Sequence, residues 1–157
     1  MVKVGDKLDT SFELKVVRNG NEETVSFSDL LDKPTIVSVY MKNNTPGCDR
    51  QNDSLAEHAA AFNEKGYNIV AISKDGCKSH QKYAEKKNIS YVLASDPDHL
   101  FSKAADAMVE KKMYGKVYEG PARAAYILGT DGTVKAVIEK INTKDHATEL
   151  FDLIDSI

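Results

Sequence analysis

The stretch Thr45-Pro46-Gly47-Cys48 places a cysteine where a strand pattern gives way to a helix pattern. Residues 35–40 just before it are apolar and rich in β-branched side chains, which predicts a buried strand. In the first turn of a helix the backbone N–H groups lack partners, and the helix dipole favours negative charge. Pro46 suits a first helical position because its φ is already helical. We therefore expect Cys48 to be biased toward the thiolate, its reactive form.

A helix end alone does not hold a thiolate near neutral pH. That form requires roughly 3.4 kcal/mol of differential stabilisation. A helix N-terminus contributes about 0.3–1 kcal/mol, and about 2 in a favourable geometry. A guanidinium about 4 Å away contributes on the order of 4 kcal/mol at an effective dielectric near 20, before desolvation is subtracted. We therefore expect a cation beside Cys48. A small buried structural cysteine is the alternative, and the polar loop around Cys48 argues against it.

Strand and helix patterns alternate along the rest of the chain. Strand patterns at residues 12–17 and 23–27 flank a turn and predict a hairpin. The order continues with a helical turn at 28–32, strands at 35–40, 67–73 and 91–94, helices at 49–65, 78–87 and 97–108, strands at 124–128 and 134–138, and a closing helix at 143–157. Residues 114–120 read as a mobile loop near the pocket. This order predicts an α/β fold with a mixed central sheet flanked by helices.

The composition is that of an ordinary globular protein. With 157 residues, 41% of them hydrophobic, the chain is long enough for one domain over residues 1–157 with its own core. Its net charge of −3, with both signs interspersed, argues against nucleic-acid and membrane partners. We find no signal-peptide core and no apolar run of membrane-spanning length. Two cysteines in such a chain predict redox-active or free thiols and a cytoplasmic location.

The segment from Tyr40 to Cys48 resembles the active-site loop of the peroxiredoxins. Its Thr-Pro-Gly-Cys form is typical of the bacterioferritin-comigratory-protein (PrxQ) subfamily. The resemblance continues in the family's order over nearly the whole chain, through Ser73-Lys74-Asp75, Lys78-Ser79-His80, Ser95-Asp96-Pro97, Lys111 to Lys116, and Arg123 before the apolar residues 124–128. It implies a thioredoxin-like fold with an N-terminal β-hairpin extension.

The resemblance also implies a thiol-dependent peroxidase for hydrogen peroxide and organic hydroperoxides. The Cys48 thiolate would attack the terminal peroxide oxygen and become a sulfenic acid. Arg123 matches the family's active-site arginine and is the expected cation, with Arg50 as the competitor. Thr45 and the backbone N–H groups of Gly47 and Cys48 are the other expected donors.

No metal, flavin or haem cofactor is expected for this chemistry. The expected partners are the hydroperoxide and thioredoxin or a similar thiol reductant. We expect the chain to be a monomer or a weak homodimer.

Two positions depart from the family's pattern. Met41 stands where the loop usually begins with a proline, which leaves the peroxide rate and the protection against over-oxidation open. Asp53 stands where many members carry a resolving cysteine, and Ala84 where others do. Cys77 is the only other thiol. It is either the resolving residue or a half-buried structural cysteine, which would make the enzyme a one-Cys type.

Other features predict ordinary structural roles. The sequence Cys77-Lys78-Ser79-His80 is half of a zinc pattern, but no second ligand pair follows. The histidines at 58, 80, 99 and 146 are expected to be solvated or to cap helices, and the lysines at 111, 112 and 116 to form a solvated charge run.

Two other functions remain open from the sequence. One is a thiol–disulfide oxidoreductase, against which the lack of a Cys-x-x-Cys pair counts. The other is a non-enzymatic redox sensor or holdase that signals through oxidation of Cys48. Peroxide turnover with a reductant present separates both from a peroxidase.

Overall fold

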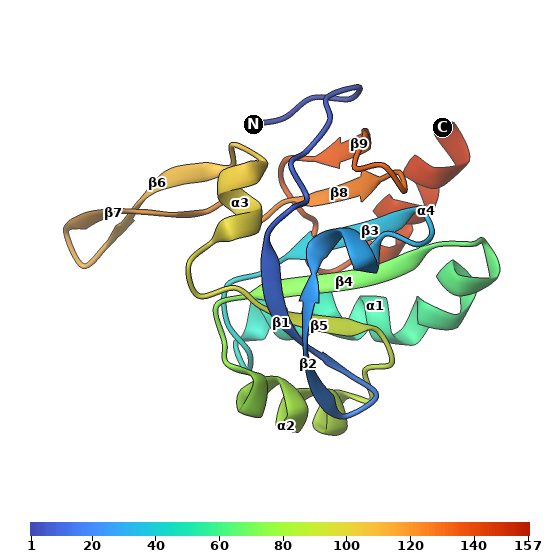
Figure 1. Cartoon of the computed structure of the whole chain (residues 1–157). Helices are drawn as coiled ribbons and strands as arrows, with labels where there is room; N and C mark the ends of the chain where they lie inside the picture. Colours follow the sequence, from blue (N-terminus) through green and yellow to red (C-terminus); the bar gives the residue numbers. More distant parts are fainter.

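The structure is a computed structural model that describes residues 1–157 (Figure 1). Seven strands form one mixed sheet in the order β2-β1-β5-β4-β3-β8-β9. The centre is parallel: β3 (Thr35–Val39) pairs with β4 (Asn68–Ser73), and β4 pairs with β5 (Val92–Ser95). All five residues of β3 are buried, as its continuous apolar pattern predicts. The carboxyl ends of these three strands therefore meet at one edge of the sheet, where α/β folds bind ligands.

Antiparallel hairpins extend this parallel centre on both sides. The N-terminal hairpin joins β1 (Glu13–Arg18) to β2 (Asn21–Ser26), and β1 pairs with β5. On the other side, β8 (Ala125–Leu128) pairs with β3 and with β9 (Val134–Ile138). The predicted mixed sheet with an N-terminal hairpin is confirmed, and the hairpin belongs to the main sheet.

Helices cover one face of the sheet. They are α1 (Pro46–Glu64), α2 (Cys77–Lys87) and α4 (His146–Ser156). Leu55, Ala59 and Phe62 recur at helical spacing along α1 and pack into a buried cluster that also contains Tyr83 of α2 and Leu150 of α4. No helix is both long enough and apolar enough to span a membrane.

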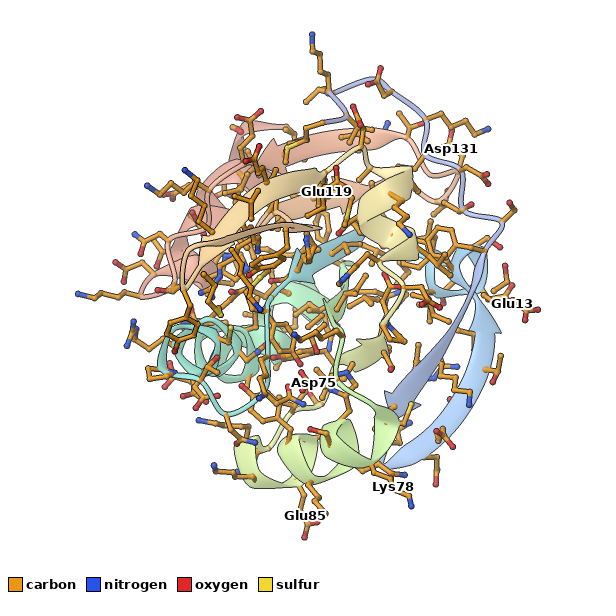
Figure 2. The ribbon with its side chains drawn as sticks, turned by 90° about the vertical axis from the view of Figure 1, so that its left-hand side faces the viewer. Glu13, Asp75, Lys78, Glu85, Glu119 and Asp131 are labelled. Carbon is orange, nitrogen blue, oxygen red and sulfur yellow. The ribbon has the colours of Figure 1, made fainter.

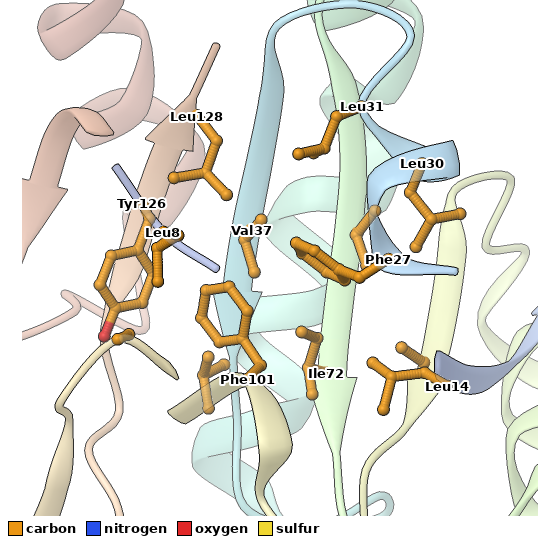
Figure 3. Packing of buried hydrophobic residues seen from close by; sticks show 14 of the residues in the cluster. Leu8, Leu14, Phe27, Leu30, Leu31, Val37, Ile72, Phe101, Tyr126 and Leu128 are labelled. Atoms are coloured by element: carbon orange, nitrogen blue, oxygen red, sulfur yellow. The ribbon is translucent and has the colours of Figure 1, made fainter. Parts of the chain in front are cut away.

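The opposite face is covered by shorter pieces. These are the N-terminal segment, the 3-10 turn η1 (Phe27–Leu30) and α3 (Leu100–Ala104). Figure 3 shows the aromatic centre of this layer, where the Phe101 ring lies 5.3 Å from Phe27 and 5.2 Å from Tyr126, centroid to centroid. Together the two layers bury the sheet and fix the positions of its strand ends.

The predicted helix over residues 97–108 is wrong in extent. Only α3 is helical there, and residues with positive φ flank it: His99 at 55° and Asp106 at 50°. A side chain in that left-handed region interrupts an α-helix at both ends. The carboxylate of Asp96 accepts hydrogen bonds from the N–H groups of Leu100 and Phe101, which fixes the start of α3.

The predicted loop at residues 114–120 is instead mostly strand. A separate hairpin joins β6 (Met108–Met113) to β7 (Lys116–Pro121) through a turn at Tyr114 and Gly115, with φ of 52° and 75°. Two positive φ values suit a tight two-residue hairpin turn. The hairpin projects from the body of the molecule in Figure 1. Its glycines at 115 and 120 gave the sequence the appearance of a loop.

Candidate active site

Cys48 is the third residue of α1, directly after the carboxyl end of β3. Thr45 is the extended N-cap and Pro46 takes the first helical position. The first helical hydrogen bond runs from the Asp49 N–H to the Thr45 carbonyl, so the N–H groups of Gly47 and Cys48 have no partner in the chain. The helix begins three residues earlier than its apolar pattern indicates, and it presents two unused donors beside the thiol.

The Cys48 thiol is fully buried, and a guanidinium lies against it. Nη2 of Arg123 is 3.3 Å from Cys48 Sγ. Arg123 lies between β7 and β8, far from Cys48 in sequence. Arg50 is exposed on α1 and lines a separate surface hollow with Asp53. Of the two candidate cations, the structure brings only Arg123 to the sulfur.

Gly47 leaves the room that Arg123 occupies. A β-carbon built on Gly47 would stand 3.0 Å from Arg123 Nη1, closer than side chains normally approach. The backbone of Gly47 is in an ordinary helical conformation, because its φ is not positive. A side chain at position 47 would therefore force the guanidinium of Arg123 to shift by a few tenths of an ångström.

Thr45 is held by its own turn. Its hydroxyl donates a hydrogen bond to the Lys42 carbonyl at 2.8 Å, and it makes no cap bond to α1. Thr45 is expected to be a donor in the site, but in this structure its hydroxyl hydrogen is engaged by the Lys42 carbonyl. The lone pairs of the hydroxyl oxygen stay available to accept a hydrogen bond from a ligand.

A cavity of about 440 Å³ opens beside this turn, at the carboxyl ends of β3 and β4. Its wall is shared by the turn at Met41 to Thr45, by these strand ends and by the β6–β7 hairpin. The apolar part includes Val39, Ile72 and Tyr118, and the cationic part Lys42, Lys74 and Lys111. Such a cavity suits a ligand with an apolar body and a polar group.

A buried polar network ties the turn before Cys48 to α2. Asn43 accepts from the Tyr40 hydroxyl at 2.6 Å, and its amide nitrogen lies 3.1 Å from His80 Nδ1. The N–H of Asn43 donates to Asp75, which precedes α2 and turns toward the middle of the molecule while Lys78 and Glu85 project outward (Figure 2). Sequence reasoning missed Asn43, because no pattern marks a side chain that bridges two loops.

His80 and His146 contradict the prediction that the histidines are solvated or cap helices. Both are fully buried, and burial lowers the pKa of His80. His146 belongs to a chain of hydrogen bonds. Nε2 of Gln51 donates to Ser38 Oγ at 2.7 Å, Ser38 Oγ lies 2.9 Å from His146 Nε2, and His146 Nδ1 lies 2.7 Å from a carboxylate oxygen of Glu149. These hydrogen bonds connect α1 to α4 through β3. Because Ser38 is fully buried in β3, substrates cannot reach this serine–histidine–carboxylate arrangement.

Cys77 is the first residue of α2 and faces another part of the protein. Its surroundings are the β1–β2 hairpin, where burial and the neighbouring Glu22 raise the pKa of the Cys77 thiol to about 11. Both cysteines are free thiols. In this conformation the thiol of Cys48 contacts Arg123, whereas Cys77 lines a surface hollow together with the acidic Glu22.

Two side chains fasten α2 to α1. The Tyr83 hydroxyl donates to Asp49 at 2.8 Å, and Lys87 forms an ion pair with Asp53 at 3.1 Å. Asp53, at the position where many family members carry a resolving cysteine, therefore anchors the helix that carries Cys77. Any approach of the two sulfurs must work against these contacts.

The predicted solvated lysine run is wrong for one of its members. Lys112 and Lys116 are exposed, but Lys111 is half-buried and its Nζ lies 2.8 Å from Met41 Sδ. Burial, with the positive charge of Arg123 nearby, lowers the pKa of Lys111. Alternation along β6 turns Lys111 toward the cavity and Lys112 away from it, which a charge count cannot reveal.

A family model described as the AhpC/TSA family matches residues 4–137. A putative peroxiredoxin bcp of Haemophilus influenzae is 32% identical over 139 residues, which cover 88% of this chain and 90% of the relative. The peroxiredoxin Bcp of Bacillus subtilis is 30% identical over 148 residues, covering 94% and 92%.

Solved structures of similar proteins cover almost the whole chain. A peroxiredoxin Q structure from Xanthomonas campestris superposes with a TM-score of 0.86 at 24% identity, covering 98% of this chain and 97% of that one. The peroxidoxin BcpB of Mycobacterium tuberculosis gives a TM-score of 0.82 at 26% identity, covering 100% and 99%.

Proposed function

The chain belongs to the AhpC/TSA family, within it to the bacterioferritin-comigratory-protein (PrxQ) peroxiredoxins, and on that premise we propose which of its residues carry the reaction. Its sheet and helices form the thioredoxin-like fold of these proteins. The chain is a thiol-dependent peroxidase, and Cys48 is the proposed nucleophile.

The first step is attack of the Cys48 thiolate on the terminal oxygen of the hydroperoxide. The S–O bond forms as the O–O bond breaks, and the leaving oxygen takes a proton to become water or an alcohol. Cys48 is left as a sulfenic acid. The 3.3 Å contact between Arg123 and the buried sulfur is the observation that carries this assignment. The guanidinium stabilises both the thiolate and the charge that develops on the peroxide.

Three further groups orient the peroxide. The free N–H groups of Gly47 and Cys48 donate to its oxygens, at the end of α1 where the dipole favours negative charge. The Thr45 oxygen accepts the hydrogen bond that the peroxide hydrogen donates, since its own hydrogen is engaged by Lys42. Together these groups hold the two oxygens in line with the sulfur.

The substrates are hydrogen peroxide and organic hydroperoxides. The cavity of about 440 Å³ with its partly apolar wall supports the organic class, because it offers space next to Thr45 for a carbon chain. One structure of the Xanthomonas campestris relative is described in terms of its alkyl peroxide reduction activity, at 23% identity to this chain.

The sulfenic acid returns to the thiol in one of two ways. In the first, Cys77 attacks Cys48, water leaves, and thioredoxin or a similar thiol reductant reduces the disulfide. Burial and the neighbouring Glu22 raise the pKa of the Cys77 thiol, which makes it a poor nucleophile until the first turn of α2 opens and exposes it. In the second, an external thiol attacks Cys48 directly and the enzyme is a one-Cys type.

Residues 1–157 act as one domain, as a monomer or weak homodimer in the cytoplasm, with no nucleic-acid or membrane partner.

Two other functions differ from this one in their use of peroxide. A non-enzymatic sensor or holdase would oxidise once and stop, whereas a thiol–disulfide oxidoreductase would act without peroxide.

Intact mass after one equivalent of hydrogen peroxide tests the proposal. Loss of two hydrogens identifies a Cys48–Cys77 disulfide, and gain of one oxygen that maps to Cys48 identifies the sulfenic acid. The Cys77→Ser variant is the control, and it should gain oxygen only. An unchanged mass in the wild-type chain contradicts the proposed function.

A further inference from the structure

Beside the cavity, the Lys111 ammonium, a strong hydrogen-bond donor, is paired with the Met41 thioether, a weak acceptor. Nζ of Lys111 donates to Met41 Sδ at 2.8 Å, and both side chains line the cavity together with Thr45. A thioether sulfur is a weak acceptor, whereas a partly buried cation needs a strong one. The ammonium is therefore incompletely satisfied by its present partner.

The backbone directs Lys111 onto Met41. Lys111 lies on β6 opposite Tyr118 of β7, and its stem passes over Gly120. A β-carbon on Gly120 would stand 3.2 Å from Lys111 Cδ, so the absence of a side chain there makes room for the stem. The next residue, Lys112, is exposed. The strand pairing of the β6–β7 hairpin thus positions Lys111 against Met41.

Other cations surround this ammonium. Burial, together with the charges of Arg123 and Lys74, lowers the pKa of Lys111, while Cys48 acts in the opposite sense. Lys111 therefore exchanges a proton more readily than a solvated lysine. An oxygen acceptor placed on the Met41 sulfur would relieve the mismatch, because a sulfoxide is polar and a thioether is not.

We propose that Met41 is a second oxidation site, where a hydroperoxide in the cavity converts the thioether to a methionine sulfoxide whose oxygen accepts a hydrogen bond from Lys111. The inference rests on the proposed function only in taking this cavity as the place where the hydroperoxide enters. The sulfoxide then ties β6 to the turn that follows β3.

The step balances with the groups present. A lone pair of Met41 Sδ attacks the terminal peroxide oxygen, the S–O bond forms and the O–O bond breaks. The leaving alkoxide or hydroxide takes a proton from Lys111. The hydroxysulfonium on Met41 then returns its proton to the Lys111 amine. In net terms the sulfur loses two electrons and the hydroperoxide becomes an alcohol or water.

The test uses a chain without thiols, Cys48→Ser with Cys77→Ser, treated with excess hydrogen peroxide and analysed by peptide mapping over time. Met113 is the internal comparison, because it lines the same cavity and is 56% exposed, whereas Met41 is only partly exposed. Exposure alone favours Met113. We expect Met41 to oxidise faster than Met113 by about tenfold.

Variants in the thiol-free background separate Lys111 from general access. Lys111→Leu should reduce Met41 oxidation to the Met113 rate or below, and Gly120→Ala, which displaces the lysine stem, should act in the same direction. Lys112→Leu is the matched control and should leave the rate unchanged. Met41 oxidising no faster than Met113, or at an unchanged rate in Lys111→Leu, overturns the proposal. Since no cysteine is present, failure here is distinct from failure of the Cys48 chemistry, which appears in peroxidase turnover of the wild-type chain.

Discussion

The guanidinium of Arg123 occupies the place that a side chain on Gly47 would need, with Nη1 3.0 Å from the point of a β-carbon. The same guanidinium reaches Cys48 Sγ through its other nitrogen, at 3.3 Å. One cation therefore contacts the sulfur of Cys48 and also fills the space beside position 47.

Gly47→Ala should move Arg123 away from the sulfur. We expect the reaction of Cys48 with hydrogen peroxide to slow by about tenfold or more, because an oriented cation at the reacting atoms is displaced. Helix stability should not fall, since alanine is favoured over glycine within a helix. Stopped-flow kinetics and thermal unfolding measure the two effects. Gly76→Ala, at the start of α2 where a β-carbon meets nothing within 4 Å, is the control. Wild-type kinetics in Gly47→Ala would contradict this displacement.

Arg123→Met should slow peroxide attack by about a hundredfold, because it removes the cation that contacts Cys48 Sγ. Arg123→Lys should recover part of the rate, because it keeps the charge but loses the planar fork of donors. Rapid-mixing kinetics with hydrogen peroxide is the readout. Arg50→Met, which changes an exposed cation on α1, should behave as wild type. The opposite ranking of the two arginines would assign the role to Arg50.

Cys77 should be slow to alkylate in the folded Cys48→Ser variant near neutral pH, since its pKa is raised to about 11 by burial and Glu22. Its alkylation rate should climb with pH toward that value. The folded pKa of this thiol lies above its unfolded value of about 8.5, so the protonated thiol favours the folded state. This contribution to stability is complete below the unfolded pKa and is lost as the pH rises through about 11. Glu22→Gln should lower the pKa and speed alkylation. Rapid alkylation of Cys77 near neutral pH in the Cys48→Ser variant, with Glu22 unchanged, would rule out this environment.

Tyr83→Phe removes the hydroxyl that joins α2 to Asp49. We expect a loss of about 1 kcal/mol in the free energy of unfolding, the usual net value of one hydrogen bond, measured by urea denaturation. If Cys77 resolves Cys48, disulfide formation should also become faster, because α2 opens more easily. Tyr67→Phe, at a half-buried tyrosine between α1 and β4, is the control. An unchanged stability in Tyr83→Phe would show that this contact contributes nothing.

Local patterns predicted the elements that depend on local physics. The β-branched run of β3, the proline at the start of α1 and the turn of the N-terminal hairpin each specify their conformation within a few residues. The position of Cys48 at the start of a helix follows from the same signals.

Features that depend on tertiary contacts could not be predicted in this way. No local pattern pairs Arg123 with Cys48, and only the family resemblance suggested it. The burial of His80 and His146 depends on partners contributed by distant elements, as with Asn43 and Ser38. The short α3 follows from left-handed residues at its ends, which the helical pattern does not reveal.

Hydrogen peroxide consumption with a thioredoxin reducing system, compared between wild type and Cys48→Ser, tests the role of Cys48 as the nucleophile most directly. Cys77→Ser serves as the control for removing a thiol, and it should keep its first turnover. We expect sustained turnover in the wild type and only the background rate in Cys48→Ser. Retention of most of the turnover by Cys48→Ser would contradict Cys48 as the nucleophile and, with it, the proposed roles of Arg123, Gly47 and Thr45.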